Sequence, residues 1–255
     1  MGAGRALSEL GVSFADADVL VLCYHVTRKP ERFAAQMRGL AQRGRSVLSL
    51  KHFTEWLRGT ASVRAPAALV TFDGGYAEQL DNAVPVLEAL KLPATFFLMS
   101  SDLEAVGPGI LRSDLAALTA AGHAIGCHSH THPDLTRLPE DELEREVLGS
   151  KRRLEEMLGQ RVSAFCYPDG AHDARVVSAV RRAGFDVAFT VGLGGVSRGD
   201  DPYRLRRVPV LGEPRSGEFL AYAAGRRVCS GTILAWWKIR ERLLDRREAW
   251  LTRRR

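Results

Sequence analysis

The chain has 255 residues, of which 45% are hydrophobic and 26% charged, a balance that excludes a disordered chain and suits one domain of barrel size. No apolar run approaches the roughly 20 residues that a bilayer-spanning helix needs, so we expect no membrane span. The formal net charge of +6 is concentrated in the last residues of the chain, which argues against a nucleic-acid surface.

The predicted elements alternate between strands and helices after an N-terminal extension at 1–18. That extension carries three acidic residues and no long apolar stretch, so we expect no secretory signal peptide and a cytoplasmic location, or a peripheral one at the inner face of the membrane. Helical patterns occupy 33–42, 111–121 and 140–158, among others. Apolar runs predict strands at 19–24, 46–50, 67–72, 94–99, 124–127, 163–166, 186–190 and 207–210. Alternation of this kind predicts a parallel sheet, and this many repeats favour a barrel over residues 19–225.

An acidic residue, Asp73, follows the strand at 67–72 and is itself followed by two glycines and a helical pattern that continues through Leu90. A carboxylate at the carboxyl end of a buried strand, where glycines let another group approach, is typical of a general base. The alternative is that Asp73 caps the next helix. Residues 164–170 have the same form, and a helical stretch at 173–182 follows them.

Three histidines, His128, His130 and His132, lie within five residues just after the strand at 124–127. A zinc-like ion binds nitrogen at about 2.1 Å, whereas positions four apart in a strand are about 13 Å apart. The segment must therefore turn, and a helical turn would bring His128 and His132 to one face while His130 points elsewhere. This spacing indicates a metal site. The alternative is a polar loop whose imidazoles bond to backbone or water.

Together these segments resemble the polysaccharide deacetylases of the NodB-homology type, also called carbohydrate esterase family four, over residues 19–210. Thr-Phe-Asp-Gly-Gly at 71–75 is similar to the family's Thr-Phe-Asp-Asp-Gly, and the segment at 128–132 to its His-Ser/Thr-x-x-His. Tyr-Pro-Asp-Gly at 167–170 is similar to its Tyr-Pro-x-Gly, and Leu-Cys-Tyr-His at 22–25 resembles the first strand of members that act on bacterial exopolysaccharides. The fold that the resemblance implies, a distorted (β/α) barrel, agrees with the alternating pattern.

The resemblance also implies a reaction and a set of roles. Asp73 would be the catalytic base, and His128 and His132 would bind a divalent ion, which is zinc or else cobalt, nickel or manganese. The reaction would release acetate and a free amine from an N-acetylated amino sugar. Three residues would wall the substrate groove and offer a backbone N–H to the oxyanion: Tyr167, Pro168 and Gly170.

Two departures from the family's pattern affect this site. Gly74 stands where the family has its third metal ligand, so the ion is bound weakly, is absent, or gains a compensating ligand, either Asp73 or Asp169. The family's late Leu-x-x-His, which often supplies the general acid, has no counterpart after His172. We therefore predict that His25, at the end of the first strand, is the general acid.

Three classes of function follow from these residues. The prediction is a metal-dependent N-deacetylase that acts on a polysaccharide, an oligosaccharide or a lipid-linked glycan precursor. The first alternative, favoured by Gly74, is a metal-poor amidohydrolase acting on a non-sugar amide or a cyclic ureide. The second is a non-catalytic barrel that binds a glycan or a partner.

Residues 226–255 are predicted to form a basic amphipathic helix. From 238 to 255 there are eight Lys/Arg against three Asp/Glu, a net +5 that leaves +1 for the preceding residues. Apolar residues, tryptophans among them, recur at helical spacing from 233 to 251. The helix either packs on the barrel or on a second subunit, or contacts an anionic membrane surface through residues 233–255. The four cysteines show no paired spacing, and we expect those beside the strand ends to be small buried residues.

Overall fold

The structure, a computed structural model, describes residues 17–103, 109–210 and 213–223. Its strands are β1 Val19–Tyr24, β2 Ser46–Val47, β3 Ala67–Asp73, β4 Thr95–Leu98, β5 Ala124–Cys127, β6 Ala164–Cys166, β7 Val187–Leu193 and β8 Leu205–Pro209. Its α-helices are α2 Pro30–Gln42, α3 Leu50–Leu57, α4 Val84–Ala89, α5 Leu115–Ala120, α6 Glu140–Glu144, α7 Ser150–Leu158, α8 Ala174–Arg182 and α9 Ser216–Ala223. Short 3₁₀ segments are η2 Arg112–Asp114, η3 Leu135–Arg137 and η5 Pro168–Gly170, and π-helical turns are η1 Gln79–Ala83 and η4 Arg145–Gly149.

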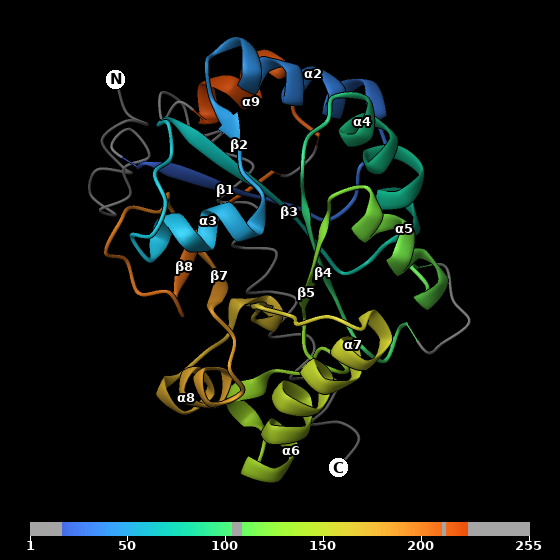
Figure 1. Ribbon diagram of the computed structural model, residues 1–255, viewed down its shortest axis with the longest axis vertical. Helices are drawn as coiled ribbons and strands as arrows, with labels where there is room; N and C mark the ends of the chain where they lie inside the picture. The colour runs from blue at the N-terminus through green and yellow to red at the C-terminus, as the bar shows by residue number, and fades with distance from the viewer. Residues whose placement is uncertain (1–16, 104–108, 211–212, 224–255) are drawn as a thin grey trace, which may run out of the picture.

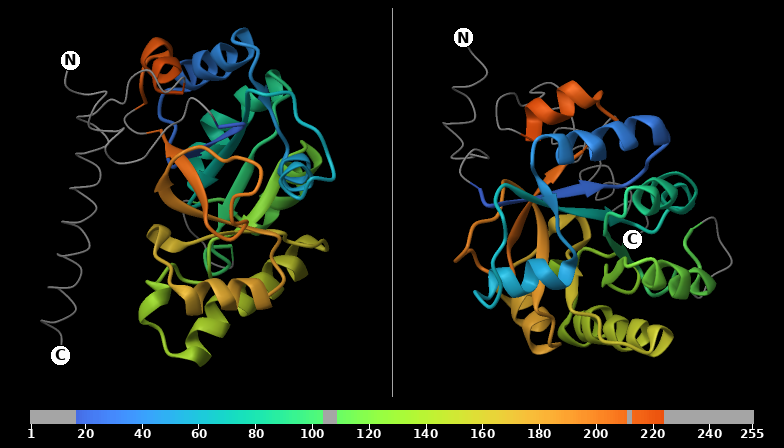
Figure 2. Two further views of the ribbon diagram at one scale, coloured as in Figure 1. Left: turned by 90° about the vertical axis from the view of Figure 1, so that its left-hand side faces the viewer. Right: turned by 45° about the horizontal axis from the view of Figure 1, so that its top comes forward.

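Seven of these strands form a closed parallel barrel in the order β1, β3, β4, β5, β6, β7, β8. Closure occurs because β1 pairs with both β3 and β8, while β2 pairs with the start of β3. Helices α4, α5, α7 and α8 lie outside the strands, and α9 lies beside α2 (Figures 1 and 2). The barrel is distorted, since a single residue pair, Cys127 with Phe165, joins β5 to β6. The predicted (β/α) barrel is confirmed.

Alternation along each strand separates two apolar clusters. In β1, Val19 and Val21 belong to the barrel interior together with Phe97 and Phe189. The alternate residues Leu20, Leu22 and Tyr24 pack against the surrounding helices. Successive strand side chains point to opposite faces, so every second residue of each strand faces into the barrel. At the carboxyl ends, the inward positions are therefore the ones that can assemble a site.

Helix α3 was not predicted, because residues 46–50 were interpreted as a strand. Only Ser46 and Val47 pair with β3, and Ser49 then caps the helix by accepting a hydrogen bond from the His52 N–H at 3.2 Å. A serine cap is the signal that could have identified this helix. Its buried side chains Phe53 and Trp56 join the interior cluster.

A histidine outside the site, His123, is buried and lowers the stability of the folded state at acidic pH. His123 is 4% exposed, and among the described residues neither of its ring nitrogens has a hydrogen-bond partner. Its ring meets Phe96 edge-on at 5.5 Å. Burial lowers the pKa of His123, and nearby Glu88 offsets this in part. Because the folded state resists protonation that the unfolded state accepts below about pH 6.5, His123 removes stability as the pH falls below that value.

We therefore expect His123→Phe to raise the free energy of unfolding by about 1–3 kcal/mol, because it removes buried polar atoms without partners. The gain should grow as the pH is lowered from 7 to 5. Urea denaturation at several pH values measures it, and pH 8, where both folded and unfolded states carry a neutral imidazole at this position, is the internal control. A difference between the two proteins that stays constant from pH 8 to pH 5 would contradict this assignment.

Parts of the predicted organisation lie beyond the described residues. These parts include the basic helix at 226–255, Cys229 and most of the extension at 1–18. Membrane contact through 233–255 therefore stays a prediction. In the portion of the chain that the structure describes, every helix is too short or too polar to cross a bilayer.

Candidate active site

Polar side chains meet inside the barrel at the carboxyl ends of five strands. Asp73 ends β3, Cys23 lies near the end of β1, Cys166 ends β6, Arg207 lies in β8, and His128 directly follows β5. All five are buried. Parallel barrels place reactive groups at this end, because the strands converge there and the loops that follow them are free to vary.

The centre of the cluster is a two-point ion pair between Asp73 and Arg207. Arg207 Nη1 donates to Asp73 Oδ1 and Nη2 to Oδ2, each at 2.7 Å, and the side chains are 1% and 4% exposed. Burial alone would raise the pKa of Asp73, but the guanidinium holds it well below its usual range. Asp73 is therefore a carboxylate at any physiological pH and does not cap the following helix.

Arg207 is itself fixed by the barrel interior. Its Nε donates to the Thr190 carbonyl at 2.8 Å, and its guanidinium lies 5.9 Å from the centre of the Phe97 ring. The sequence did not identify this residue as part of the site. The available signal was a charged residue at an inward position of a strand, since Leu205 and Arg207 share the buried face while Arg206 is exposed.

Two thiols contact the same carboxylate. The sulfur atoms of Cys23 and Cys166 each lie 3.5 Å from Asp73 Oδ2, and Arg207 Nη2 is 3.1 Å from the Cys166 sulfur. Burial raises the pKa of both thiols, so they are protonated and act as weak donors. Within the described residues Cys23, Cys127 and Cys166 are unpaired and buried, which confirms the expectation for these three.

His128 is held in the form that can bind a metal ion. Its Nδ1 lies 2.8 Å from the Cys166 carbonyl oxygen, and because that oxygen only accepts, Nδ1 carries the proton and Nε2 keeps its lone pair. Burial lowers the pKa of His128 to about 4, despite the opposing effect of Asp73. The imidazole is neutral at physiological pH, as ligation requires.

His132 reaches His128 by a tight loop and not by the predicted helical turn. The two rings are 4.7 Å apart between centroids and meet at 81°. The chain reverses because Ser129 and His132 adopt left-handed conformations, with φ of 66° and 61°. The prediction that the segment turns is confirmed, while the helical form of the turn was wrong. His130 points elsewhere, and its Nδ1 lies 2.8 Å from the Ser100 hydroxyl.

His25, the predicted general acid, lies at the same end of the barrel. A ring nitrogen of His25, the Cys23 sulfur and an Asp73 oxygen all lie within 4.8 Å of one another. Burial lowers the pKa of His25, and Asp73 offsets this in part. Its ring is thus close enough to exchange a proton with a substrate bound beside Asp73.

The loop at 167–170 uses two of its backbone amides for hydrogen bonds of its own. The N–H of Tyr167 donates to Phe189 O at 3.1 Å and that of Gly170 to Tyr167 O at 2.8 Å, while Pro168 has no N–H. The Tyr167 hydroxyl donates to Tyr203 O at 2.9 Å. In this conformation the amides of Tyr167 and Gly170 are already used, so their oxyanion role stays a prediction.

Asp169, the predicted compensating ligand, is partly buried in the same loop and has a φ of 52°. Its charge acts on the His25 ring, as does that of His132. Asp169 therefore lies at the same end of the barrel as His25. Its role as a ligand stays a prediction.

Among the described residues, no group of three close donor atoms contains both His128 and His132. His128 has a free Nε2 lone pair beside the His132 ring, and Gly74, with a φ of 90°, contributes no donor. The triads of donor atoms that lie within 4.8 Å of one another, among the described residues, are Cys23–His25–Asp73 and Asp73–His128–Cys166. Neither includes His132. In addition, a Cβ at position 74 would meet the Tyr76 ring at 2.7 Å.

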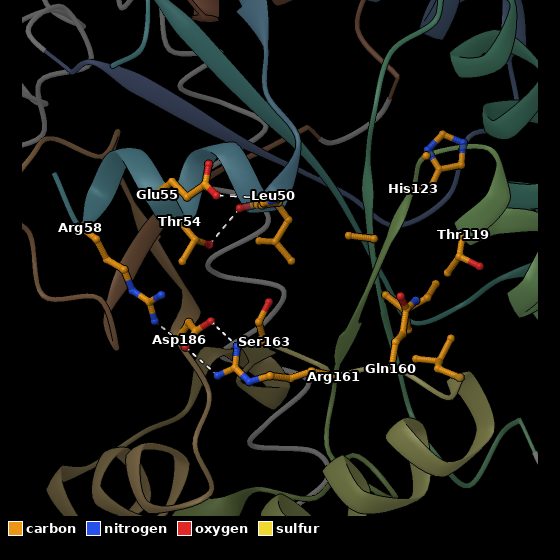
Figure 3. Close-up of a pocket in the computed structure, with 15 residues that line it drawn as sticks. Leu50, Thr54, Glu55, Arg58, Thr119, His123, Gln160, Arg161, Ser163 and Asp186 are labelled. Atoms are coloured by element: carbon orange, nitrogen blue, oxygen red, sulfur yellow. Dashed lines mark hydrogen bonds and ion pairs between the residues drawn. The ribbon is translucent and has the colours of Figure 1, made fainter. Parts of the chain in front are cut away.

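A cavity of about 460 Å³ lies at the opposite, amino-terminal end of the strands, between α3 and the loops that precede β5, β6 and β7. In Figure 3, Arg58 and Arg161 reach Asp186 from opposite sides. These ion pairs join the end of α3 and the loop before β6 to the residue that precedes β7. None of the five buried residues Cys23, Asp73, His128, Cys166 and Arg207 lines the cavity. We interpret this end of the barrel as the one that maintains the fold.

Comparisons with known proteins agree with the motifs. The profile of the polysaccharide deacetylase family matches residues 60–188. YxkH of Bacillus subtilis (strain 168) is 27% identical over 215 residues, which cover 81% of this chain and 76% of YxkH. The peptidoglycan-N-acetylglucosamine deacetylase of Bacillus cereus is 32% identical over 99 residues, or 38% of this chain and 33% of that protein. The solved structure of the Streptococcus pyogenes deacetylase PplD in complex with acetate has the same fold, with a TM-score of 0.76 at 20% identity over 80% of this chain and 97% of that one.

Proposed function

This chain belongs to the polysaccharide deacetylase family, hydrolases that act on C–N bonds, and we propose that it removes the N-acetyl group of an amino sugar. The substrate would be a polysaccharide, an oligosaccharide or a lipid-linked glycan precursor, and the products acetate and a free amine. The similarity to a deacetylase of peptidoglycan N-acetylglucosamine supports this class of substrate.

The observation that carries the proposal is the ionised Asp73, paired with Arg207 and within 4.8 Å of donor atoms of both His25 and His128. A carboxylate that is ionised in the resting protein and lies at the mouth of the barrel can accept a proton from a water that attacks the amide carbonyl. Arg207 keeps the carboxylate charged and fixes its orientation. The proton taken from the water would return to the leaving nitrogen through His25, the general acid, whose ring nitrogen lies within 4.8 Å of an Asp73 oxygen.

His128 and His132 are the residues that would hold a divalent ion. Such an ion, when bound, polarises the amide carbonyl and lowers the pKa of a water molecule. The chain itself contributes the tautomer of His128, which the Cys166 carbonyl selects. It also contributes the close approach of the two rings.

One observation favours a second candidate function. Gly74 offers no ligand, and Tyr76 occupies the space that a side chain there would need. A site with weak or no metal binding could hydrolyse a more reactive non-sugar amide with Asp73 as base. Dependence of the activity on added metal distinguishes this candidate from the sugar deacetylase.

The test is acetate release from N-acetylglucosamine oligomers by the full chain, with and without added Zn²⁺ or Co²⁺. We expect Asp73→Asn to lower kcat by about 10²–10⁴-fold, because a general base is lost, and His128→Ala and His132→Ala to abolish the dependence on metal.

His130→Ala is the matched control for these variants, since His130 lies between the two ligands in sequence and its ring bonds to Ser100 instead. It should retain most activity. Equal losses in all three histidine variants would indicate disruption of the loop and not of a metal site. Activity that Asp73→Asn leaves unchanged would overturn the proposal.

A further inference from the structure

The loop that carries His132 needs an external partner to hold its shape. Ser129 and His132 both have positive φ, and a left-handed conformation costs a residue with a Cβ about 1–2 kcal/mol. Such conformations persist where the surroundings over-determine them, and they concentrate at functional sites. The structure shows which side chains hold this loop.

Glu146 accepts three hydrogen bonds from the loop. Its Oε2 accepts from the N–H of His130 at 2.8 Å and of Thr131 at 2.9 Å, and its Oε1 accepts from the Thr131 hydroxyl at 2.7 Å. The Glu146 side chain is buried. Hydrogen bonds to a carboxylate are about twice as strong as neutral ones. Glu146 therefore holds two consecutive peptide units of the loop firmly in place.

Three further backbone groups of the loop are also hydrogen-bonded. The N–H of His132 donates to the Ser129 hydroxyl at 2.9 Å. On the other side, the N–H groups of Ser100 and Ser101 donate to the carbonyls of Ser129 and His130. Three consecutive amides, from His130 to His132, therefore each have a side-chain acceptor, and Glu146 supplies two of the three.

Glu146 lies in a π-helical turn of the helix that bears it. The turn η4 interrupts the helical stretch between α6 and α7, and the Ser150 hydroxyl donates to the carbonyls of Glu146 and Val147. The same hydroxyl lies 3.1 Å from the sulfur of Cys127 at the end of β5. Single π-turns of this kind recur at functional sites. Here the turn attaches the helix to the strand that leads directly into His128.

We propose that Glu146 is a positioning residue of the site: its carboxylate holds the loop at 129–132 in the left-handed turn that places the His132 imidazole beside His128. This inference rests on the proposed function in one respect, namely that the two imidazoles bind a divalent ion. The three hydrogen bonds that Glu146 accepts from the loop do not depend on metal binding.

The first measurement is hydrogen exchange of the His130 and Thr131 amides in the full chain without metal. We expect Glu146→Ala to accelerate exchange at these two amides, while amides in β5 keep their protection. Glu144→Ala, an exposed glutamate two residues earlier on the same helical stretch, is the matched control and should change neither. Unchanged protection in Glu146→Ala would overturn the proposal.

The second measurement is the affinity for Zn²⁺ or Co²⁺ alone, by calorimetry and by the visible absorption of bound Co²⁺. We expect Glu146→Ala to weaken binding about 10–100-fold, the range for residues that orient metal ligands. Glu146→Gln keeps an acceptor for both amides and should restore most of the affinity. If Glu146→Ala fails to fold, Glu146→Gln is measured in its place. Thr131→Val, which removes one of the three hydrogen bonds, is then measured beside it.

The outcomes distinguish the positioning role of Glu146 from the metal-dependent part of the proposed function. Faster exchange with unchanged metal affinity would show that Glu146 anchors the loop without positioning a ligand, and would overturn the proposal. If the unaltered protein binds neither ion, the metal-dependent part of the proposed function fails. The exchange result then still decides whether Glu146 holds the loop.

Discussion

Replacing Arg207 with alanine is expected to lower the free energy of unfolding by about 3–5 kcal/mol, because it leaves the Asp73 carboxylate buried without a counter-charge. Both oxygens of Asp73 accept from this one guanidinium, and the two thiols beside it are too weak as donors to replace a cation. Burial would then raise the pKa of Asp73. The loss of stability should therefore be largest at neutral pH and shrink as the pH is lowered and Asp73 takes up a proton. Chemical denaturation between pH 4 and pH 8 measures both effects.

A double-mutant cycle provides the control for this prediction. In Asp73→Asn/Arg207→Met both charges are removed, so the loss of stability should be smaller than the sum of the two single losses. Arg207→Lys keeps the charge but cannot make two parallel hydrogen bonds, and should fall between the unaltered protein and Arg207→Ala. Losses that simply add in the double variant would show that the Asp73–Arg207 pair contributes no coupling energy.

Introducing aspartate at position 74 is expected to tighten the binding of Zn²⁺ or Co²⁺ about tenfold or more, which corresponds to at least about 1.4 kcal/mol. The resemblance places the third ligand of the family at this position, and a carboxylate would add a charged donor next to the two imidazoles. The same change should lower stability by about 1–2 kcal/mol, because Gly74 has a φ of 90° and only glycine adopts such values at no cost. Calorimetric titration measures the binding, and thermal unfolding of the metal-free protein measures the cost.

Two further variants test whether the added carboxylate is the cause. Gly74→Asn has nearly the same shape without the charge and should bind the ion little better than the unaltered protein. Gly74→Asp/Tyr76→Ala removes the ring that a Cβ at 74 would meet at 2.7 Å, and should bind at least as tightly as Gly74→Asp. Equal affinity in the unaltered protein and in Gly74→Asp would mean that position 74 does not face the ion.

Much of the site could be predicted from local sequence. Asp73 and His128 each stand at the end of an apolar run, and the carboxyl ends of parallel strands meet at one end of a barrel, so their proximity followed once the alternation of strands and helices was recognised. For His128 and His132 to bind the same metal ion, their spacing required the chain to turn between them. The structure contains such a turn. These inferences depend on periodicity and on short-range geometry, which a single sequence displays.

The conformation of that turn could not be predicted in the same way. A helical turn and a loop with two left-handed residues both bring positions four apart together. The choice depends on Glu146, which lies 15 residues beyond Thr131 and meets it through a different element. The hydrogen bond from the Tyr167 N–H to Phe189 in β7 could not be predicted for a related reason, since the motif does not reveal which strand lies beside it.

Local pattern therefore determined the fold class of this chain, the order of its strands, and the identity of Asp73, His128 and His132 as the residues to consider. Strand and helix periods are set by each residue's immediate neighbours, and for that reason a single sequence shows them. Tertiary structure alone decided that Arg207 neutralises Asp73 from 134 positions away in sequence, and that Glu146 holds the histidine loop. A buried charge must find its partner wherever the fold brings one within reach, and closure of the barrel brings β8 and β3 to the same interior.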